Sequence, residues 1–311
     1  MVLARIGLTG SSGMLGRHLR AAFKAVGTDV VAVSRSGADG SAKWDMAEWL
    51  TPERLDMLFG DVQAIVHAGA IVDSAAAGSQ ARMFDVNVRA CANLAEWGVS
   101  RSIPFVFISS ASVYVDPDSG HLSEGAPMGA NQIGGFYGMT KLMAEDILGR
   151  YRARGLKLAV LRPSCLYGYG GPESKMLYKF LSLAARGKTI DLTPCIEDRI
   201  DFLHAADLSN AVVGVLKRAC WDTLNIASER PVSIRELALA CVETAGRGHV
   251  RVQDAEPSEV PPLRRFYLDA TAARERLGWT STIGIHQGLE MVLSGRFVAG
   301  QASLFNQAER L

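Results

Sequence analysis

The chain has 311 residues, of which 48% are hydrophobic and 21% charged, so it is long enough to bury a large core in one two-lobed domain or in two closely joined domains. Lysine and arginine number 33 against 32 for aspartate and glutamate, a balance that gives no electrostatic reason to expect nucleic acid or an anionic membrane as a partner. The five cysteines are widely spread without a C-x-x-C pair, which argues against a disulfide framework and a metal site.

The N-terminal stretch MVLARIGLTG lacks the apolar core of a signal peptide. No apolar run approaches the roughly 18 residues needed to span a bilayer. From these two features we expect a soluble protein located in the cytoplasm.

Short β-branched runs then alternate with segments of helical period. The expected strands are at 4–10, 29–35, 64–70, 104–112, 156–164 and 222–228, and the expected helices at 14–26, 79–97, 137–154, 174–187 and 206–218. The strands are continuously apolar, as in a parallel sheet covered by helices on both faces, so the pattern predicts an α/β fold. We predict a dinucleotide-binding domain of residues 1–166 and 201–228, and a smaller, mostly C-terminal substrate-binding lobe of residues 167–200 and 229–311.

A glycine-rich turn, TGSSGMLG at 9–16, joins the first expected strand directly to an amphipathic helix. Glycines at a spacing of three suit a turn with unusual backbone angles, a close approach of pyrophosphate and tight contact between helix and strand. The helix N-terminus adds unpaired N–H groups and positive potential. This order of elements predicts a dinucleotide cofactor, and the residues expected to bind it here are Gly10, Ser12, Gly13, Met14, Leu15 and Gly16.

The ends of the next strands bear on the choice of cofactor. A site for NAD normally has an acid after the second strand, and here the positions are Ser34, Arg35 and Ser36. A cation flanked by hydroxyls suits the extra phosphate of NADP, so we expect NADP rather than NAD, although Arg35 is also consistent with a solvated loop.

Other strand ends supply further candidates for the cofactor site. Asp45, followed by Met46, falls where a third strand would end near the adenine, and capping of a helix explains Asp45 equally well. His67 closes the fourth strand and is expected to be a core residue. The small residues after it permit close passage of the cofactor, namely Ala68, Gly69 and Ala70.

Tyr137 and Lys141 stand four residues apart in GGFYGMTKLMAED and would share one face of a helix. An ammonium near a phenol favours the phenolate, so the pair has the properties of a proton-transfer device. The spacing alone is weak evidence, because surface pairs with it are common.

Taken together, the motifs resemble the extended short-chain dehydrogenase/reductase family, which contains nucleotide-sugar epimerases, dehydratases and reductases. The resemblance is carried by TGSSGMLG at 9–16, HAGA at 67–70, FDVNV at 84–88, ISSASVY at 108–114, YGMTK at 137–141, LRPSCLYG at 161–168, DFLHAADLSNAV at 201–213 and LGW at 277–279. It implies a Rossmann doubly wound sheet. It also implies Tyr137 as general acid/base, and Lys141 on the nicotinamide ribose lowering the pKa of that tyrosine. Ser110 would bind the reacting oxygen, with its neighbours Ser109 and Ser112 as alternatives, and all three are equally consistent with caps at the end of a strand. Asn87 and Pro163 would line the cofactor site.

The resemblance also bears on the reaction. Dehydratases carry an Asp-Glu pair after the catalytic hydroxyl, where this chain has Ala111 and Ser112. Dehydration is therefore disfavoured, whereas epimerisation at a secondary alcohol needs only the Ser/Tyr/Lys set. We expect an NAD(P)-dependent nucleotide-sugar epimerase. The alternatives are an NADP-dependent reductase of a keto-sugar or other small carbonyl compound, and a non-catalytic NADP-sensing protein.

The substrate residues are harder to assign. Arg199 lies near the position where relatives bind the substrate diphosphate, although the usual register falls on Ile200; Arg264 and Arg265 resemble a second diphosphate contact or a solvated loop. Ser110 and Ser112 complete the expected substrate contacts. Asp207 is expected to be the N-cap of its helix. The helices at 79–97 and 137–154 have enough apolar residues to pair in a homodimer.

Overall fold

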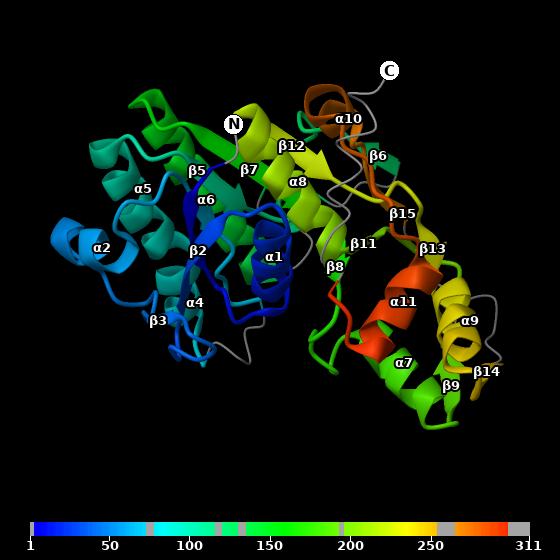
Figure 1. Cartoon of the computed structure of the whole chain (residues 1–311). Coiled ribbons are helices and arrows are strands. Elements are labelled where there is room, and N and C mark those ends of the chain that lie inside the picture. The colour runs from blue at the N-terminus through cyan, green and yellow to red at the C-terminus, as the bar shows by residue number, and fades with distance from the viewer. Residues whose placement is uncertain are drawn as a thin grey trace, which may run out of the picture.

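The computed structural model describes residues 3–72, 78–115, 120–129, 135–192, 196–253 and 265–297. Its centre is a seven-stranded sheet in the order β12-β7-β5-β4-β1-β2-β3 (Figure 1). All neighbouring strands of this sheet are parallel. The strands are β1 (Arg5–Thr9), β2 (Asp29–Ser34), β3 (Ala42–Lys43), β4 (Ile65–His67), β5 (Phe105–Ile108), β7 (Leu158–Pro163) and β12 (Thr223–Ile226). The predicted Rossmann α/β fold is confirmed.

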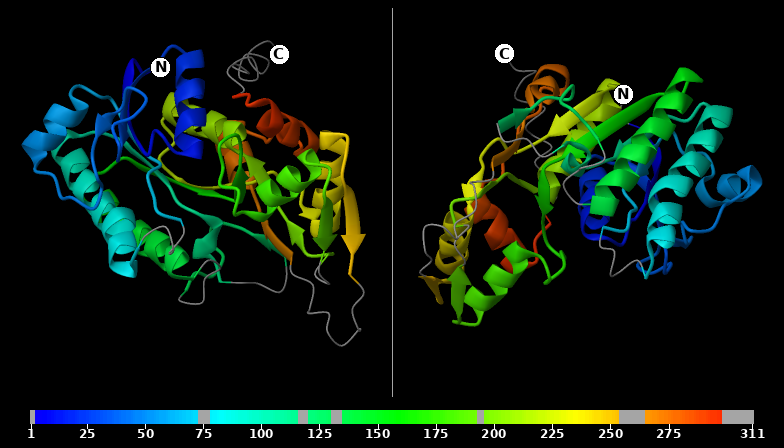
Figure 2. Two further views of the ribbon diagram at one scale, coloured as in Figure 1. Left: turned by 90° about the horizontal axis from the view of Figure 1, so that it is seen from below. Right: turned by 180° about the vertical axis from the view of Figure 1, so that it is seen from behind.

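Helices cover both faces of this sheet, as the views from the front and from behind show (Figures 1 and 2). On one face α1 (Met14–Ala25) packs against α8 (Ala205–Arg218), and on the other α5 (Ala90–Arg101) packs against α6 (Gly135–Ala153). Helix α2 (Pro52–Phe59) contributes Leu55 and Phe59 to the same hydrophobic cluster as the buried residues of α5 and α6. The apolar residues recur at helical spacing, so each helix buries one stripe against the sheet.

The helix expected at 79–97 is divided into three parts. It begins as α4 (Gln80–Phe84), continues as a π-helical turn η1 (Asp85–Arg89) and becomes α5. Asn87 lies inside the π-helical turn and is 1% exposed. Such turns insert an extra residue into a helix and occur frequently at functional sites.

A second group of elements packs beside the large sheet (Figure 1). It contains a four-stranded sheet, β6 (Gly120–Leu122), β10 (Arg199–Ile200), β13 (Val232–Ser233) and β15 (Arg265–Leu268). It also contains two strand pairs, β8 (Cys165–Tyr167) with β11 (Phe202–His204) and β9 (Thr189–Leu192) with β14 (His249–Val252), and three helices, α7 (Met176–Ala185), α9 (Ile234–Ala245) and α11 (Ile285–Ser294). A short helix, α10 (Thr271–Leu277), packs on β12 and α8. Since β6 comes from within 1–166, this sheet uses both predicted domains, and the domain division stays a proposal.

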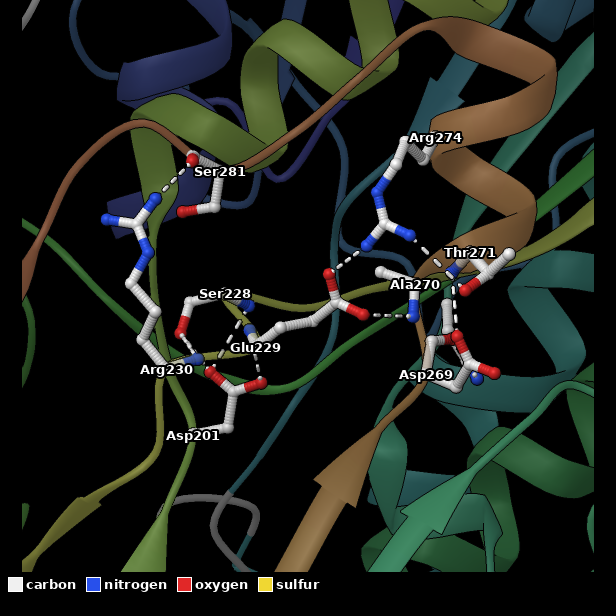
Figure 3. Close-up of polar contacts among 10 residues, drawn as sticks. Asp201, Ser228, Glu229, Arg230, Asp269, Ala270, Thr271, Arg274 and Ser281 are labelled. Carbon is white, nitrogen blue, oxygen red and sulfur yellow. Dashed lines mark hydrogen bonds and ion pairs between the residues drawn. The ribbon is translucent and has the colours of Figure 1, made fainter.

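Asp201, which follows β10, forms hydrogen bonds with the segment that follows β12 of the large sheet (Figure 3). Its buried carboxylate accepts hydrogen bonds from the N–H and hydroxyl of Ser228 and from the N–H of Glu229, just after β12. Glu229 has a φ of 57°, and its own carboxylate accepts from Ala270 N and Arg274. The junction is therefore closely hydrogen-bonded.

Asp207 is not the N-cap of α8. That position is His204, whose Nδ1 accepts from the N–H of Ala206 at 3.2 Å. The buried Asp207 carboxylate instead accepts from the hydroxyl of Ser281 at 2.8 Å, the N–H and hydroxyl of Thr282 at 3.1 and 2.9 Å, and Ile283 N at 3.0 Å. Asp207 thus anchors the segment that follows LGW, a long-range role that local sequence does not reveal.

Candidate active site

The candidate site lies at the carboxyl edge of the large sheet. The chain fills strands β1, β2 and β3 toward one side and then β4, β5, β7 and β12 toward the other, so the order reverses between β1 and β4. Ligands of such sheets bind in the crevice beyond this reversal. The glycine-rich turn, Arg35 and the segment 68–70 follow β1, β2 and β4, and Ser34 and Pro163 end β2 and β7.

The glycine-rich turn has the geometry that its glycines predicted. Gly10 has a φ of 68°, and a Cβ on it would lie 2.6 Å from Gly69 Cα. A Cβ on Gly16 would lie 2.7 Å from Ser11 Cα and closer still to the Gly10 carbonyl. Gly13, the N-cap of α1, provides no side-chain cap, whereas Thr51 and Ser233 cap α2 and α9. The N–H groups of the first turn, formed by Met14, Leu15 and Gly16, therefore have no side-chain acceptor, and the turn fits a dinucleotide pyrophosphate.

The turn after β2 differs from the expected arrangement. Ser34 is 3% exposed, and its hydroxyl bonds the Ser41 hydroxyl at 2.6 Å and accepts from Gly37 N at 3.1 Å. The Ser36 hydroxyl accepts from Ala38 N at 3.3 Å. Both expected hydroxyls thus stabilise their own turn, because serine readily bonds nearby backbone groups. Arg35 is exposed and is the member of the trio that remains suited to a phosphate.

Asp45 lies near this turn but is paired with another residue. Its carboxylate accepts from Arg82 of α4 at 2.7 Å and from Ala47 N at 3.1 Å, so it opens a turn rather than capping a helix. Partial burial opposes ionisation, yet the bond and charge of Arg82 prevail and lower the pKa of Asp45. The Met46 side chain covers Gly69, where an added Cβ would lie 2.8 Å from Met46 Sδ.

The segment after β4 is fixed by polar contacts. Gly69 N donates to the Thr9 hydroxyl at 3.3 Å, and half-buried Ala68 and Ala70 flank Gly69. Asn87 binds both backbone groups of Ile71, at 2.8 and 2.9 Å. Its amide also donates to the Thr140 hydroxyl at 3.0 Å, which connects this segment to α6. As expected, His67 is a core residue: it is 1% exposed, and burial lowers its pKa to about 3.

Ser110, Tyr137 and Lys141 come together beyond β5. The Ser110 hydroxyl lies close enough to the Tyr137 hydroxyl to lower its pKa. Lys141 is 3% exposed; its Nζ donates to the Ile108 carbonyl at 2.8 Å and lies 5.9 Å from the centre of the Tyr137 ring. Helix α6 therefore presents the tyrosine and the lysine at the end of β5, where Ser110 begins the short 3-10 turn η2 (Ala111–Val113).

The pKa of Tyr137 is raised, so the lowering expected from Lys141 and the nicotinamide stays a prediction for the enzyme with its cofactor bound. Burial raises the pKa of Tyr137 to about 12, and the Ser110 hydroxyl only partly opposes this rise. Burial also lowers the pKa of Lys141 to about 8, against the charges of Cys91 and Glu145. Burial thus dominates both pKa values in this arrangement, in which the Lys141 ammonium donates to a backbone carbonyl.

The predicted substrate residues are more dispersed. The Ser112 hydroxyl accepts from that of Ser110 at 3.0 Å, so it belongs to the site. Arg199 donates to Glu236 at 3.2 Å in the second group of elements, where its Cα pairs with that of Arg265 on the adjacent strand. Arg264 lies outside the described residues. Pro163 ends β7 and pairs with Ile226 of β12.

Sequence reasoning missed a buried ion pair beside this set. Arg162 Nη2 lies 2.6 Å from Glu145 Oε2, and the Ser109 hydroxyl donates to the same carboxylate. The spacing of Glu145, four residues after Lys141, was the signal that would have placed it on the catalytic face of α6. Arg82 was also missed, because its partner Asp45 is 37 residues away.

Within the described ranges, no three side chains of metal-binding type gather into a possible metal site. The four cysteines there, Cys91, Cys165, Cys220 and Cys241, are free thiols. In the same part of the chain, no helix is long and apolar enough to cross a membrane.

Comparison with known proteins decides the family. The model of the NAD dependent epimerase/dehydratase family matches residues 6–227. The chain belongs to this family. Members of the family are NAD(P)-dependent enzymes, and the chain is accordingly an enzyme of the extended short-chain dehydrogenase/reductase type.

Individual relatives of the family span nearly the whole chain. A UDP-glucose 4-epimerase of Bacillus subtilis is 25% identical over 90% of this chain and 93% of its own length. A GDP-6-deoxy-D-mannose reductase of Pseudomonas aeruginosa is 26% identical over 93% of this chain and 96% of its own. The solved structure of MoeE5 with UDP-glucose and NAD has a TM-score of 0.78 and 25% identity, and the match covers 93% of this chain and 97% of that one.

Proposed function

We propose that this chain is an NAD(P)-dependent epimerase of a nucleotide sugar, acting by transient oxidation at a secondary alcohol. The observation that carries the proposal is the convergence of three side chains at the end of β5: Lys141 Nζ, bound to the Ile108 carbonyl, lies 5.9 Å from the Tyr137 ring, and the Ser110 hydroxyl acts on the Tyr137 hydroxyl. Similarity to the UDP-glucose 4-epimerase of Bacillus subtilis supports this reaction class. The same relatives make a nucleotide sugar the best-supported substrate class.

The reaction requires a proton and a hydride to leave the same carbinol group. Bound NAD(P) supplies the acceptor for the hydride and later its donor. Tyr137 takes the hydroxyl proton and returns it when the hydride is delivered to the opposite face of the keto-sugar. Ser110 donates a hydrogen bond to the reacting oxygen, and Lys141 stabilises the phenolate with its charge. The mechanism needs such a charge, since an unassisted phenol does not ionise near neutral pH.

The cofactor is proposed to lie along the carboxyl edge of the sheet. The backbone of residues 10–16 would hold its pyrophosphate, and Met46 and Gly69 would border its adenosine. Asn87 and Pro163 would fix the segments on either side of the nicotinamide. Arg35 is the proposed partner of a 2′-phosphate, and for this reason we propose NADP over NAD.

The nucleotide-sugar diphosphate is proposed to bind where β10 and β15 run side by side. The Cα atoms of Arg199 and Arg265 pair across these strands, which brings two arginine positions together. Paired guanidinium groups suit bidentate recognition of phosphate. Ser112, in contact with Ser110, is proposed to bind the sugar. We also propose a homodimer formed through α4, α5 and α6, since Phe84 of α4 is 40% exposed.

An NADP-dependent reductase is the second candidate, and two observations favour it. Arg35 favours NADP, the cofactor from which net reduction draws its electrons. A reductase of Pseudomonas aeruginosa is among the relatives.

The two candidates are separated by the cofactor and by its consumption. The purified protein is denatured, the released dinucleotide is identified by mass spectrometry, and the native protein is incubated with UDP-glucose without added cofactor. An epimerase converts UDP-glucose to its epimer with its retained cofactor, whereas a reductase turns over only with a keto-sugar and consumes one NADPH per product. Cofactor binding without turnover of either substrate would favour the third candidate, a non-catalytic NADP-sensing protein.

A further inference from the structure

Glu145 shares the face of α6 that carries the proposed catalytic pair. It follows Lys141 by four residues and Tyr137 by eight, so the three side chains form one stripe along the helix. The Glu145 side chain is 9% exposed, and that of Arg162 is 5% exposed. A buried carboxylate requires compensation, because transfer of a charge out of water is costly.

The Glu145 carboxylate receives full compensation from two partners. Arg162 donates to it through Nη2 at 2.6 Å and through Nε at 3.1 and 3.2 Å to the two oxygens. The Ser109 hydroxyl donates to Oε1. Burial alone would lower the pKa of Arg162, but the bonds and charge of Glu145 outweigh burial and raise it. Arg162 therefore keeps its positive charge beside the Glu145 carboxylate.

These contacts connect α6 to the residues that precede Ser110. Lys141 Nζ binds the carbonyl of Ile108, and Glu145 binds the hydroxyl of the next residue, Ser109. Two successive residues at the end of β5 are thus attached to two successive turns of α6. Ser110 comes next in the chain, so its position relative to Tyr137 depends on both attachments.

The same pair extends to more distant elements. Arg162 Nη1 donates to the Tyr114 hydroxyl at 2.8 Å, which in turn donates to Asn225 Oδ1 at 2.7 Å. Asn225 lies on β12, and its amide donates to the Leu122 carbonyl of β6 at 2.8 Å. The position of Glu145 is therefore fixed by strands from both sheets, which gives it little freedom to shift.

The charge of Glu145 has a second effect, on Lys141. Burial lowers the pKa of Lys141 to about 8, and the negative charge of Glu145 counteracts part of this lowering. An ammonium with a pKa near the working pH is sensitive to any loss of negative charge around it. Glu145 is thus placed to keep Lys141 protonated.

We propose that Glu145 is a positioning residue for the proton-transfer set, holding Ser110 at Tyr137 through Ser109 and placing a carboxylate one helical turn from Lys141. This inference rests on the proposed function. The oxygens of Glu145 are occupied by Arg162 and Ser109, so the proposed role is to position other groups. Its two roles use different atoms, so Ser109→Ala removes the first role while leaving the charge, and Glu145→Gln removes the charge while keeping the size of the side chain.

The first test measures Lys141 directly and needs no turnover. The protein is labelled with lysine carrying ¹³C at Cε, the Lys141 signal is assigned by its loss in Lys141→Arg, and its titration is followed by NMR. In Glu145→Gln the Lys141 titration is expected to move down by about one pH unit, the size typical of one nearby opposite charge. In Ser109→Ala it is expected to stay at the wild-type position. An unmoved titration in a folded Glu145→Gln protein would overturn the electrostatic role, even if no substrate were ever found.

The second test measures turnover once a substrate is known. Ser109→Ala is expected to lower kcat about tenfold with little change in KM, because it loosens Ser110 without touching the substrate site. Glu145→Asp retains the charge and should keep the alkaline limb of the pH profile, which Glu145→Gln should shift toward lower pH. Wild-type kcat in Ser109→Ala would refute the positioning role, and this variant removes too little to prevent folding. A wild-type protein without turnover would count against the proposed function and leave the NMR result as it stands.

Discussion

The glycine-rich turn offers a prediction whose size follows from the packing. In Gly16→Ala the new Cβ would lie 2.7 Å from Ser11 Cα, whereas ordinary contacts begin near 3.4 Å. The backbone must therefore move by about 0.7 Å or more, and overpacking of this kind typically costs about 1–3 kcal/mol. The atoms that move carry the N–H groups proposed to hold the pyrophosphate. A loss of at least about 1.4 kcal/mol of binding, a tenfold rise in Kd for NADPH, is expected.

Two other glycines provide matched controls. A Cβ on Gly13 would lie 3.3 Å from the Gly10 carbonyl, so Gly13→Ala demands a shift of only about a tenth of an ångström and should weaken NADPH binding much less. Gly149, on α6, has no atom within 4 Å of an added Cβ. Gly149→Ala should leave binding unchanged and stabilise the protein by up to about 1 kcal/mol, since alanine favours a helix.

The assay is titration with NADPH followed by cofactor fluorescence, together with thermal unfolding of the apoprotein. The expected order of Kd is Gly16→Ala above Gly13→Ala, with Gly149→Ala equal to wild type. A Gly16→Ala protein that binds NADPH with wild-type affinity would refute the assignment of this turn as the pyrophosphate site.

Three further predictions concern other parts of the molecule. Arg35→Ala should weaken NADPH binding by about ten- to a hundredfold, the loss of one charged hydrogen bond, and leave NADH binding unchanged; equal effects on both cofactors would contradict the NADP preference. Burial lowers the pKa of His67 and His204 to about 3, so each is neutral in the folded protein. The unfolded histidines take up a proton below a pH of about 6.5, so the free energy of unfolding is highest above that pH and falls below it by about 1.4 kcal/mol per pH unit for each histidine. Urea unfolding between pH 5 and 7 should show this fall in the free energy of unfolding. In His204→Gln the fall per pH unit should be smaller by about 1.4 kcal/mol, the effect of one proton. An unchanged pH dependence would count against a neutral His204. Asp207→Ala should cost about 3–5 kcal/mol in urea unfolding because it leaves four donors without their acceptor, whereas Asp222→Ala, which removes a half-exposed ion pair with Arg276, should change little; similar midpoints for the two variants would contradict the anchoring role.

The sequence predicts the fold well where local pattern and tertiary structure agree. The apolar strands and the glycine-rich turn gave the parallel sheet and its first helix, because alternation of such elements allows few other arrangements. The single helix expected at 79–97 failed to anticipate the π-helical turn, since periodicity does not register one inserted residue. Asn87 lies in this turn, and its side chain binds Ile71 and Thr140, which are 16 and 53 residues away in the sequence. Local pattern does not reveal such contacts.

The site was predictable only in part, for the same reason. Ser110, Tyr137 and Lys141 were found from motif and spacing, and the structure brings them together. Ser34 was expected to face the cofactor, but its hydroxyl is used by its own turn, which only the fold of residues 34–41 reveals. The pKa of Tyr137 also depends on burial, a quantity that spacing along a helix does not give.

The measurement that most directly tests the central claim is a single-turnover experiment on Tyr137→Phe. Protein loaded with the oxidised cofactor is mixed with a nucleotide sugar that the wild type accepts, and reduction of the bound cofactor is followed by its absorbance near 340 nm. We expect Tyr137→Phe to bind the cofactor with nearly wild-type affinity and to lose at least about a hundredfold in the rate of reduction, the usual contribution of a general base. Wild-type rates in Tyr137→Phe would show that another group removes the proton and would contradict the assigned mechanism.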